Sequence, residues 1–309
     1  MELSGKSVLV TGGAGLIGTH LTESLAEEND VLVADNCSKG NREWVPETAA
    51  FAECDLTDEG DVAEVVTSDL DIVFHLGALS DVNRGDHRRV FDHNNAMVYN
   101  LLERMDEVGI SKIAFASSSA VYGEAPRPTP EDFAPLEPVS TYGASKLAGE
   151  GLLSTYAHSH DFTTWMFRFS NVVGPHQRNN VISDFIEKLL DDPESLEILG
   201  DGRQEKSYLH VEDCVAGMEH VVEHTDEPTN IYNLGTRTTT SVTRIAELVS
   251  DVVGCDPEFE YTGGDRGWTG DVPKMRLSIE KASAIGWSPE RESAQAVRTA
   301  AEQLYDELA

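Results

Sequence analysis

Short apolar runs alternate with longer stretches of helical periodicity over the first two-thirds of the chain. Short runs bounded by turn residues predict buried strands, and the longer stretches predict helices that cover a sheet. The predicted strands span residues 7–11, 31–35, 50–55, 71–76, 112–117 and 162–168. Helices are predicted at 15–28, at about 90–108 and in the stretch that carries Tyr142 and Lys146. This order predicts an α/β fold with a doubly wound parallel sheet covered on both faces.

The pattern changes after about residue 171, where the predicted strands become brief. They span 197–199, 206–209 and 230–234, and helices such as 211–224 and 242–253 separate them. We expect a first domain over residues 1–170, to which later segments at about 207–240 return. Residues 171–309 are expected to form mainly a smaller α/β lobe.

Three glycines, Gly12, Gly15 and Gly18, lie between the first predicted strand and the first predicted helix. Glycines at this spacing allow a tight turn, close approach of a pyrophosphate and close packing of the helix on the strand. The helix N-terminus, at Leu16 and Ile17, adds free N–H groups and the positive end of the helix dipole. A glycine triplet alone is common in loops. Its place between a strand and a helix predicts a dinucleotide site in a Rossmann-type domain.

Asp35 ends the second predicted strand, seventeen residues after Gly18. A carboxylate there accepts hydrogen bonds from an adenosine ribose 2′-hydroxyl and repels a 2′-phosphate, which favours NAD over NADP. The alternative is an aspartate in an ordinary strand-end turn. The other residues expected to contact NAD from the ends of strands are Asn36, Asp55, Leu56, Leu76, Gly77 and Ala78. For the last three, an ordinary turn is again the alternative.

Tyr142 and Lys146 are four residues apart, so on a helix both side chains lie on one face. A neighbouring cation stabilises a phenolate, lowers the pKa of the tyrosine and allows it to take a proton from an alcohol. We therefore predict a lowered pKa for Tyr142 and an enzyme that removes hydride from a carbinol carbon. A single pair at this spacing also arises by chance, so the argument depends on the surrounding motifs.

The glycine spacing, Asp35, residues 117–123 and the pair of Tyr142 and Lys146 together resemble the extended short-chain dehydrogenase/reductase family. Within it, the chain is most similar to the NAD-dependent nucleotide-sugar epimerases and dehydratases, especially the UDP-glucose 4-epimerases. The resemblance runs from Ser4 to about Pro289. Further matching residues are Asn94, 100–103, 168–175, 200–202, His210, Val211, Asp213, 232–235, Gly270 and Asp271.

The resemblance implies catalytic roles for three residues. Ser118 hydrogen-bonds the reacting sugar oxygen, Tyr142 is the base, and Lys146 lowers the pKa of Tyr142 and holds the nicotinamide ribose. It also implies a cofactor contact for Asn94. In the implied reaction Tyr142 removes the C4-hydroxyl proton as hydride passes to NAD. The 4-keto sugar then turns over, and hydride returns to its opposite face. Because net oxidation is zero, the cofactor is expected to stay bound.

The residues after Ser118 bear on the reaction type. The 4,6-dehydratases and several decarboxylases of this family carry an acid where this chain has Ser119 and Ala120. Neither side chain can transfer protons at C5 and C6 of a sugar. A 4-epimerase or a simple 4-keto oxidoreductase is therefore favoured. The alternatives are a 4-keto reductase, a C3 or C5 epimerase, a dehydratase and a non-catalytic NAD-binding regulator.

The resemblance implies that residues 171–309 mainly bind substrate. The implied substrate contacts are Ser118, Ser119, Tyr142, Asn171, Lys206, Arg266 and Asp271. Lys206 stands where the family frequently has an arginine, and a lysine lacks the bidentate fork. Trp268 replaces another arginine of the family, and Met275 falls at a position that gates C2 N-acetyl groups in some members. These departures leave the nucleotide and the sugar open, with a UDP-sugar favoured.

The chain carries 55 acidic and 23 basic side chains, a net charge of −32 that is spread through the predicted helices. Such a surface disfavours nucleic-acid binding, which needs basic contacts to phosphate. It indicates adaptation to a cytosol of very high salt, where screening removes most of the surface repulsion. An ordinary acidic bacterial enzyme is the alternative.

The four cysteines are far apart and match no metal spacing, so we expect them to be reduced. No apolar run approaches the ~18 residues of a membrane span, and the N-terminus lacks a signal-peptide pattern. We expect a cytoplasmic protein without a metal site, in which His75, His93 and His210 are packed or solvated. The helices at 90–108 and 142–159 resemble the pair that forms a dimer interface in this family. A homodimer is therefore expected, with ordinary sheet-facing core as the alternative.

Overall fold

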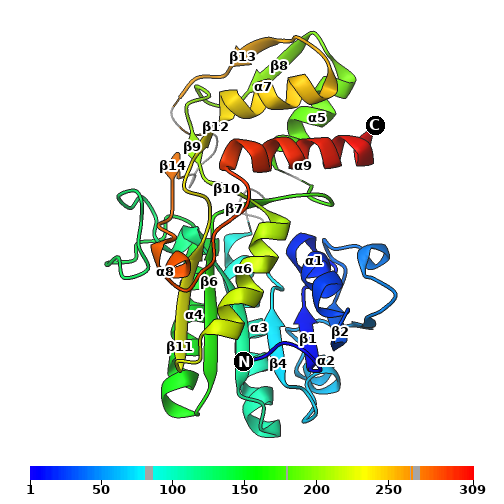
Figure 1. Cartoon of the computed structure of the whole chain (residues 1–309), viewed down its shortest axis with the longest axis vertical. Helices are drawn as coiled ribbons and strands as arrows, with labels where there is room; N and C mark the ends of the chain where they lie inside the picture. The colour runs from blue at the N-terminus through cyan, green and yellow to red at the C-terminus, as the bar shows by residue number, and fades with distance from the viewer. Residues whose placement is uncertain (81–85, 179, 265, 267–271) are drawn as a thin grey trace. The chain divides into compact units, whose positions relative to one another are not determined.

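The computed structural model describes residues 1–80, 86–178, 180–264, 266 and 272–309 (Figure 1). Its chain divides into two compact units. The Rossmann unit comprises Met1–Val121, Ser140–Arg168 and Val215–Tyr232. The second unit comprises Tyr122–Val139, Phe169–Cys214 and Asn233–Ala309. Each unit is therefore assembled from separate stretches of the sequence.

A seven-stranded parallel sheet in the order β11-β6-β5-β4-β1-β2-β3 forms the centre of the Rossmann unit. The strands are β1 (Ser7–Thr11), β2 (Asp30–Asp35), β3 (Ala50–Glu53), β4 (Ile72–His75), β5 (Lys112–Ser118), β6 (Thr163–Phe169) and β11 (Thr229–Leu234). The chain leaves β1 toward β2 on one side, and later returns to β4 on the other side. Ligands of such sheets bind at this reversal of strand order. The predicted α/β fold class is confirmed.

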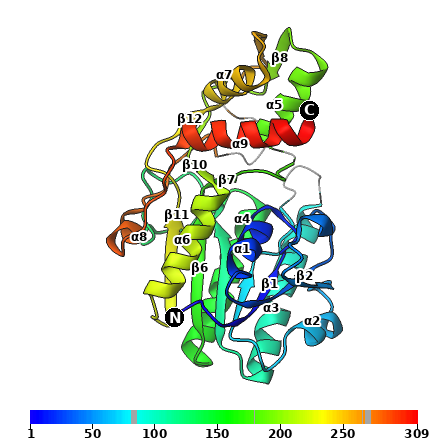
Figure 2. The ribbon, with the colours of Figure 1, turned by 45° about the vertical axis from the view of Figure 1, so that its right-hand side comes forward.

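Helices cover both faces of this sheet (Figures 1 and 2). They are α1 (Leu16–Leu25), α2 (Glu59–Val65), α3 (His87–Val108), α4 (Thr141–Ser159) and α6 (Val211–His224). α1 and α6 share one face, where Glu219 of α6 hydrogen-bonds to Ser24 of α1. α3 and α4 pack together on the other face. The central strands β1, β4 and β5 are mostly buried because both of their faces are covered, and Val8, Leu9 and Val10 are fully buried.

Local sequence signals account for the ends of the two helices on this second face. The Asp86 side chain accepts a hydrogen bond from the Arg89 N–H at the start of α3, and Gly109 ends that helix in the left-handed conformation. The Ser140 hydroxyl accepts a hydrogen bond from the Gly143 N–H at the start of α4. This cap fixes the first turn of the helix that carries Tyr142.

The second unit combines three small sheets with four helices among its described residues. The sheets pair β7 (Asn171–Val173) with β10 (Tyr208–His210), β8 (Ser195–Ile198) with β13 (Glu258–Tyr261), and β9 (Glu205–Lys206) with β12 (Thr240–Ser241) and β14 (Lys274–Met275). The helices are α5 (Val181–Asp191), α7 (Val242–Val253), α8 (Glu280–Ala284) and α9 (Ser293–Leu308). Buried side chains such as Ile186, Ile245 and Leu304 join α5, α7 and α9 in one core.

Two of the predicted elements differ clearly from the structure. The helix predicted over 15–28 ends at Leu25, where the Ala26 N–H closes the last turn on the Thr22 carbonyl. The strand predicted over 206–209 is two strands, because Ser207 donates its N–H to β14 and accepts at its carbonyl from Asn171 of β7. The strand predicted over 230–234 is present as β11 and lies in the large sheet.

Residues Arg42–Trp44 and Ser119–Val121 form single 3₁₀ turns, η1 and η2. None of the helices in the described part of the chain combines the length and the apolar character needed to cross a membrane.

Candidate active site

The glycine-rich turn contains two positions that the protein itself restricts to glycine. Gly12 has a φ of +69°, and a Cβ there would lie 2.5 Å from the Gly77 nitrogen. A Cβ on Gly18 would lie 2.2 Å from the Gly12 carbonyl oxygen. These distances are shorter than any real contact, so neither residue can carry a side chain while the backbones stay in place.

Gly15 is different, because a Cβ there would meet only the Gly12 oxygen at 3.4 Å, an ordinary contact. Gly15 is also the N-cap of α1, and no side chain caps this helix end. The first N–H groups of α1, at Leu16 and Ile17, therefore lack the usual side-chain acceptor. A pyrophosphate at this helix end would explain both features, so the turn fits the NAD that the sequence predicts.

Asp35 at the end of β2 is tied to this turn. Its Oδ2 accepts a hydrogen bond from the Ala14 N–H at 3.1 Å, and its Oδ1 accepts one from the Cys37 N–H at 2.8 Å. A carboxylate has about four acceptor sites, so Asp35 keeps capacity for a ribose hydroxyl. Asn36 is exposed, and its Oδ1 accepts a hydrogen bond from the Ser38 N–H.

The remaining predicted NAD contacts lie at the carboxyl ends of neighbouring strands. The Leu76 N–H donates to the Thr11 carbonyl, and the Leu76–Gly77 backbone lies against Gly12. A Cβ on Gly77 would lie 3.2 Å from Cδ1 of Leu56, so this leucine lies beside the same turn. Ala78 follows, half-buried. The structure thus brings the ends of β1 and β4 and the segment after β3 together.

Asp55 is held by local contacts. Its Oδ1 accepts hydrogen bonds from the N–H and the hydroxyl of Thr57, and these hold the pKa of Asp55 below its usual value. The Asp55 N–H in turn donates to Asp61 at the start of α2. Asp55 therefore stays charged and fixed directly before Leu56.

Asn94 of α3 braces the site through all of its amide hydrogens. Its Nδ2 donates to the Leu79 carbonyl at 3.0 Å and to the Ser145 hydroxyl at 2.9 Å, while its Oδ1 accepts from the Leu79 N–H. Both N–H donors are thus used within the protein. The contacts connect α3 to the segment after Ala78 and to α4. A cofactor contact by Asn94 remains a prediction and would have to use Oδ1 or the nonpolar atoms.

The structure brings the three predicted catalytic residues together in the Rossmann unit. Tyr142 is in the first turn of α4, and its hydroxyl forms a hydrogen bond with Ser118 at the end of β5. Lys146 is one turn further along α4 and is buried, with Nζ 5.8 Å from the centre of the Tyr142 ring. The helical spacing of Tyr142 and Lys146 inferred from the sequence is thus present.

The pKa of Tyr142 is shifted in the direction opposite to the prediction. Tyr142 is half-buried, and the protein atoms crowded around its hydroxyl raise its pKa to about 12. The hydrogen bond with Ser118 opposes this rise. Burial also lowers the pKa of Lys146, to about 7. Desolvation therefore sets the direction of both pKa shifts.

A buried ionic network beside these residues was not predicted. The Arg168 guanidinium of β6 donates to both oxygens of Glu150 of α4, and the Ser117 hydroxyl donates to the same carboxylate at 2.5 Å. Ser117 thereby links β5 to α4. An available signal was the spacing of Lys146 and Glu150, which puts both on one face of the helix.

His75 belongs to a second buried cluster at the carboxyl end of the sheet. Its Nδ1 is 2.7 Å from the Thr11 hydroxyl, and its ring stacks on Phe115 with centres 5.7 Å apart. Burial, with a smaller contribution from Lys146, lowers the pKa of His75 to about 3. His75 is therefore packed and uncharged, as the sequence suggests for an isolated histidine.

The other predicted substrate residues are distributed over both units. Ser119 opens η2 in the Rossmann unit, and the neighbouring Ala120 N–H donates to the Ser118 hydroxyl. Asn171 and Lys206 of the second unit lie in β7 and β9, and Lys206 pairs with Met275 of β14. The Arg266 guanidinium donates to Glu124 at 2.6 Å in an exposed ion pair. Asp271, together with Trp268 and Gly270, lies outside the described residues.

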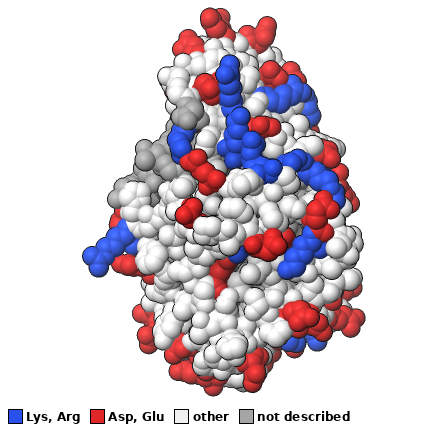
Figure 3. Space-filling view, turned by 90° about the vertical axis from the view of Figure 1, so that its left-hand side faces the viewer, with Lys and Arg blue, Asp and Glu red and all other residues white. Residues whose placement is uncertain are grey.

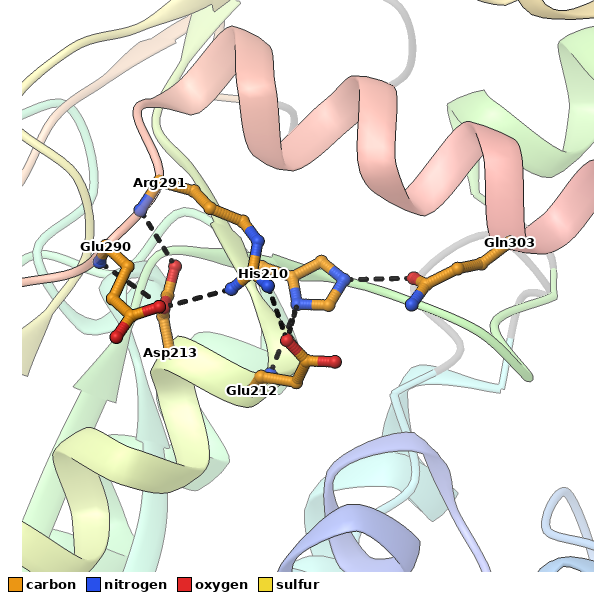
Figure 4. Close-up of polar contacts among 6 residues, drawn as sticks. All are labelled: His210, Glu212, Asp213, Glu290, Arg291 and Gln303. Atoms are coloured by element: carbon orange, nitrogen blue, oxygen red, sulfur yellow. Dashed lines mark hydrogen bonds and ion pairs between the residues drawn. The ribbon is translucent and has the colours of Figure 1, made fainter.

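His210 and Asp213, which are among the residues that match the family, make structural contacts within the second unit (Figure 4). His210 is buried, with Nε2 3.0 Å from the Gln303 side chain of α9. Asp213 accepts hydrogen bonds from the Glu290 N–H and from Arg291, which also pairs with Glu212. These contacts fix the start of α6 to the segment before α9. The described residues contain no group of three or more His, Cys, Asp or Glu side chains suited to a metal ion.

Comparison with known proteins places this geometry in a family. Residues 8–235 match the model of the NAD dependent epimerase/dehydratase family. A solved UDP-galactose 4-epimerase superposes with a TM-score of 0.90 at 38% identity, covering 98% of this chain and 100% of that one. A UDP-glucose 4-epimerase from Thermotoga maritima with UDP-glucose gives 0.90 at 31%, with the same coverage.

A dehydratase is also among the relatives. The dTDP-D-glucose 4,6-dehydratase of Mus musculus is 32% identical over 303 residues, 92% of this chain and 84% of that protein. The family model covers most of this chain, and its relatives align over nearly the whole length. The chain therefore belongs to the NAD-dependent epimerase/dehydratase family and is an NAD-dependent enzyme of nucleotide-sugar chemistry.

Proposed function

We propose that this protein is a nucleotide-sugar 4-epimerase of the UDP-glucose/UDP-galactose type. The observation that carries the proposal is the grouping of Ser118, Tyr142 and Lys146, followed by Ser119 and Ala120 with no acidic side chain. The grouping fits oxidation of a sugar alcohol. The two small residues after Ser118 fit a reaction that stays at one carbon. The two solved 4-epimerases support the same assignment.

Each of the three residues has a defined task in this proposal. Tyr142 takes the proton of the C4 hydroxyl, and Ser118 hydrogen-bonds the same sugar oxygen and the Tyr142 hydroxyl. Lys146 places a cation beside the phenolate that forms, which favours proton removal. Bound NAD would supply the hydride acceptor, and the cradle at Gly15 and Asp35 would hold it. On the return step Tyr142 gives the proton back, so the protein ends in its starting protonation state.

A 4,6-dehydratase is the second candidate, because the mouse relative carries that activity in its name at 32% identity. That reaction needs a side chain that moves protons at C5 and C6 of the sugar. Ser119 and Ala120 occupy the positions of the acid in the resemblance, and neither can do so. The residues therefore favour epimerisation over dehydration. A 4-keto reductase or a C3 or C5 epimerase would use the same three catalytic residues and is separated by its products.

The proposal assigns the first domain to NAD and residues 171–309 mainly to the substrate. Asn171, Lys206 and Arg266 are the described residues of that part offered for the nucleotide diphosphate. Lys206 can neutralise a phosphate as a point charge. Arg266 would have to exchange Glu124 for a phosphate, and their exposed ion pair of 2.6 Å is weak enough to allow this.

We also propose adaptation to high salt and a homodimer. The net charge of the chain is −32, and the face shown in Figure 3 carries scattered acidic side chains together with a group of Lys and Arg side chains. At molar salt the screening length falls to about 3 Å, which removes most of the repulsion between acidic side chains.

The exposed Phe91 and Tyr99 lie two turns apart on α3 and offer apolar surface for a second copy of the chain. A mass in solution twice that of the chain would support the dimer.

Incubation with UDP-galactose in molar KCl, followed by separation of the sugars, tests the proposed function. We expect UDP-glucose to accumulate without net formation of NADH. Tyr142→Phe should lower the rate by at least 10²-fold and keep NAD bound, because only the proton acceptor is removed. If the protein interconverts neither this pair nor the N-acetyl pair, the assignment is refuted. A 4-keto-6-deoxy product would establish the dehydratase instead.

A further inference from the structure

The ammonium group of Lys146 lies over an aromatic ring. Its Nζ is 4.7 Å from the centre of the Phe115 ring, closer than to the ring of Tyr142 at 5.8 Å. Both Lys146 and Phe115 are buried, with exposed fractions of 3% and 1%. A cation at this distance from a ring face is attracted by the negative charge of that face, and more strongly when both are out of water.

Two further contacts fix the Phe115 ring. The ring stacks on His75, which is hydrogen-bonded to Thr11 of β1. On another side the ring meets α4, where a Cβ on Gly149 would lie 2.8 Å from Cζ of Phe115. A side chain at 149 would therefore displace the ring. Gly149 is three residues after Lys146, so the same helix that carries the lysine makes room for the ring.

We propose that Phe115 is a positioning residue, which holds the protonated Lys146 side chain through its ring face and is itself seated by Gly149. The proposal rests on the proposed function only in so far as Lys146 acts in catalysis. Phe115 touches neither substrate nor cofactor in this account. Its effect on the reaction passes through the charge and the place of Lys146, which must be an ammonium to stabilise the Tyr142 phenolate.

The other groups around Lys146 do not neutralise its ammonium charge, so the face of the Phe115 ring is a local source of stabilisation for that charge. On α4 these groups are Tyr142 and, one turn further, Glu150, whose charge is bound to Arg168 of β6. From β4 the facing group is His75, which burial keeps uncharged near neutral pH. From β5 the facing group is Phe115. Burial alone lowers the pKa of Lys146 to about 7, so a modest loss of stabilisation would leave it neutral at physiological pH.

The test is the titration of Lys146 by NMR in protein labelled with ¹³C-lysine, without substrate. The chain has eight lysines, and the signal missing from Lys146→Met identifies this one. Phe115→Met keeps an apolar side chain of similar volume and removes the ring face. We expect the midpoint of Lys146 to fall by about one pH unit. An unchanged or raised midpoint would show that the ring is only packing, and would overturn the proposal.

A matched pair of glycine variants on α4 tests the seating of the ring. Gly149→Ala should shift the Lys146 midpoint and lower turnover of UDP-galactose at neutral pH, with its high-pH limb moved to lower pH. Gly151→Ala, where a Cβ would meet nothing within 4 Å, should change neither. Equal midpoints in the two variants would contradict the proposal. If Gly149→Ala does not fold, Phe115→Met decides alone. If the wild-type chain does not turn over UDP-galactose, the proposed function fails while the titration still decides the role of Phe115.

Discussion

The guanidinium of Arg168 and the carboxylate of Glu150 form a bidentate ion pair inside the Rossmann unit. Nε of Arg168 is 2.9 Å from Oε1 of Glu150, and Nη2 is 2.7 Å from Oε2. Their side chains are only 3% and 5% exposed. Ser117 adds a third donor to the same carboxylate. The pair therefore fastens α4, which carries Tyr142 and Lys146, to β5 and β6.

Glu150→Ala should destabilise the protein strongly. It leaves the Arg168 charge buried without a partner, which typically costs about 3–5 kcal/mol of the free energy of unfolding. Denaturant unfolding at constant high salt measures this loss. The control is Glu107→Ala, which breaks an exposed pair with Arg104 and should cost about 0–1 kcal/mol. Equal losses in the two variants would show that the buried network does not brace the fold.

Alanine substitutions at two glycines should separate folding from cofactor binding. Gly12→Ala places a Cβ 2.5 Å from backbone at a positive φ, so the melting temperature should fall by many degrees. Gly15→Ala meets only an ordinary contact at 3.4 Å, so the melting temperature of NAD-free protein should stay near wild type. The stabilisation that added NAD gives should then be lost in Gly15→Ala. A Gly15→Ala protein with normal NAD affinity would contradict the phosphate cradle.

Much of this site follows from local sequence, and the rest depends on tertiary contacts. The glycine turn, Asp35 and the spacing of Tyr142 and Lys146 are readable because strand and helix periods fix their neighbours. Glu150 and Arg168 could not be paired from sequence, because eighteen residues and a change of element separate them. The pKa of Tyr142 was predicted in the wrong direction. The direction of this pKa shift depends on how Tyr142 is buried, which only the packed sheet and helices determine.

Buried Lys146 should reduce stability in a pH-dependent way. Its pKa is near 10.5 when exposed and about 7 in the fold, so between these values the unfolded chain binds more protons. Stability should therefore rise with pH from about 7 to 10.5, and the cost of burying the charge is full below pH 7. Lys146→Met should raise the free energy of unfolding at pH 7, on the order of a few kcal/mol.

Denaturant titrations of Lys146→Met and wild type over this pH range check the prediction. The stability gained by the variant should shrink as pH rises, and the proposed epimerase activity should be lost. If the free energy of unfolding gained in Lys146→Met does not vary with pH, the charge on Lys146 does not lower the stability of the fold. Lys112→Met, at the half-buried first residue of β5, removes another lysine of the same unit and serves as the control.

The acidic surface predicts a requirement for salt. Net charge of −32 repels itself over a screening length of about 10 Å at 0.1 M salt and about 3 Å at 1 M. The melting temperature should therefore fall steadily as KCl is lowered, and the Rossmann helices should unfold on dialysis. Circular dichroism at a series of KCl concentrations measures this. A protein equally stable with and without salt would point to an ordinary acidic enzyme.

The central claim is that hydride leaves and returns to one carbon, and a deuterium label tests it most directly. UDP-galactose carrying deuterium at C4 should give UDP-glucose that retains the deuterium at C4, with no deuterium in water and no net NADH. Tyr142→Phe should release neither product nor label. Loss of the label to solvent, or its appearance at another carbon such as C6, would contradict the account and indicate a different reaction on the same residues.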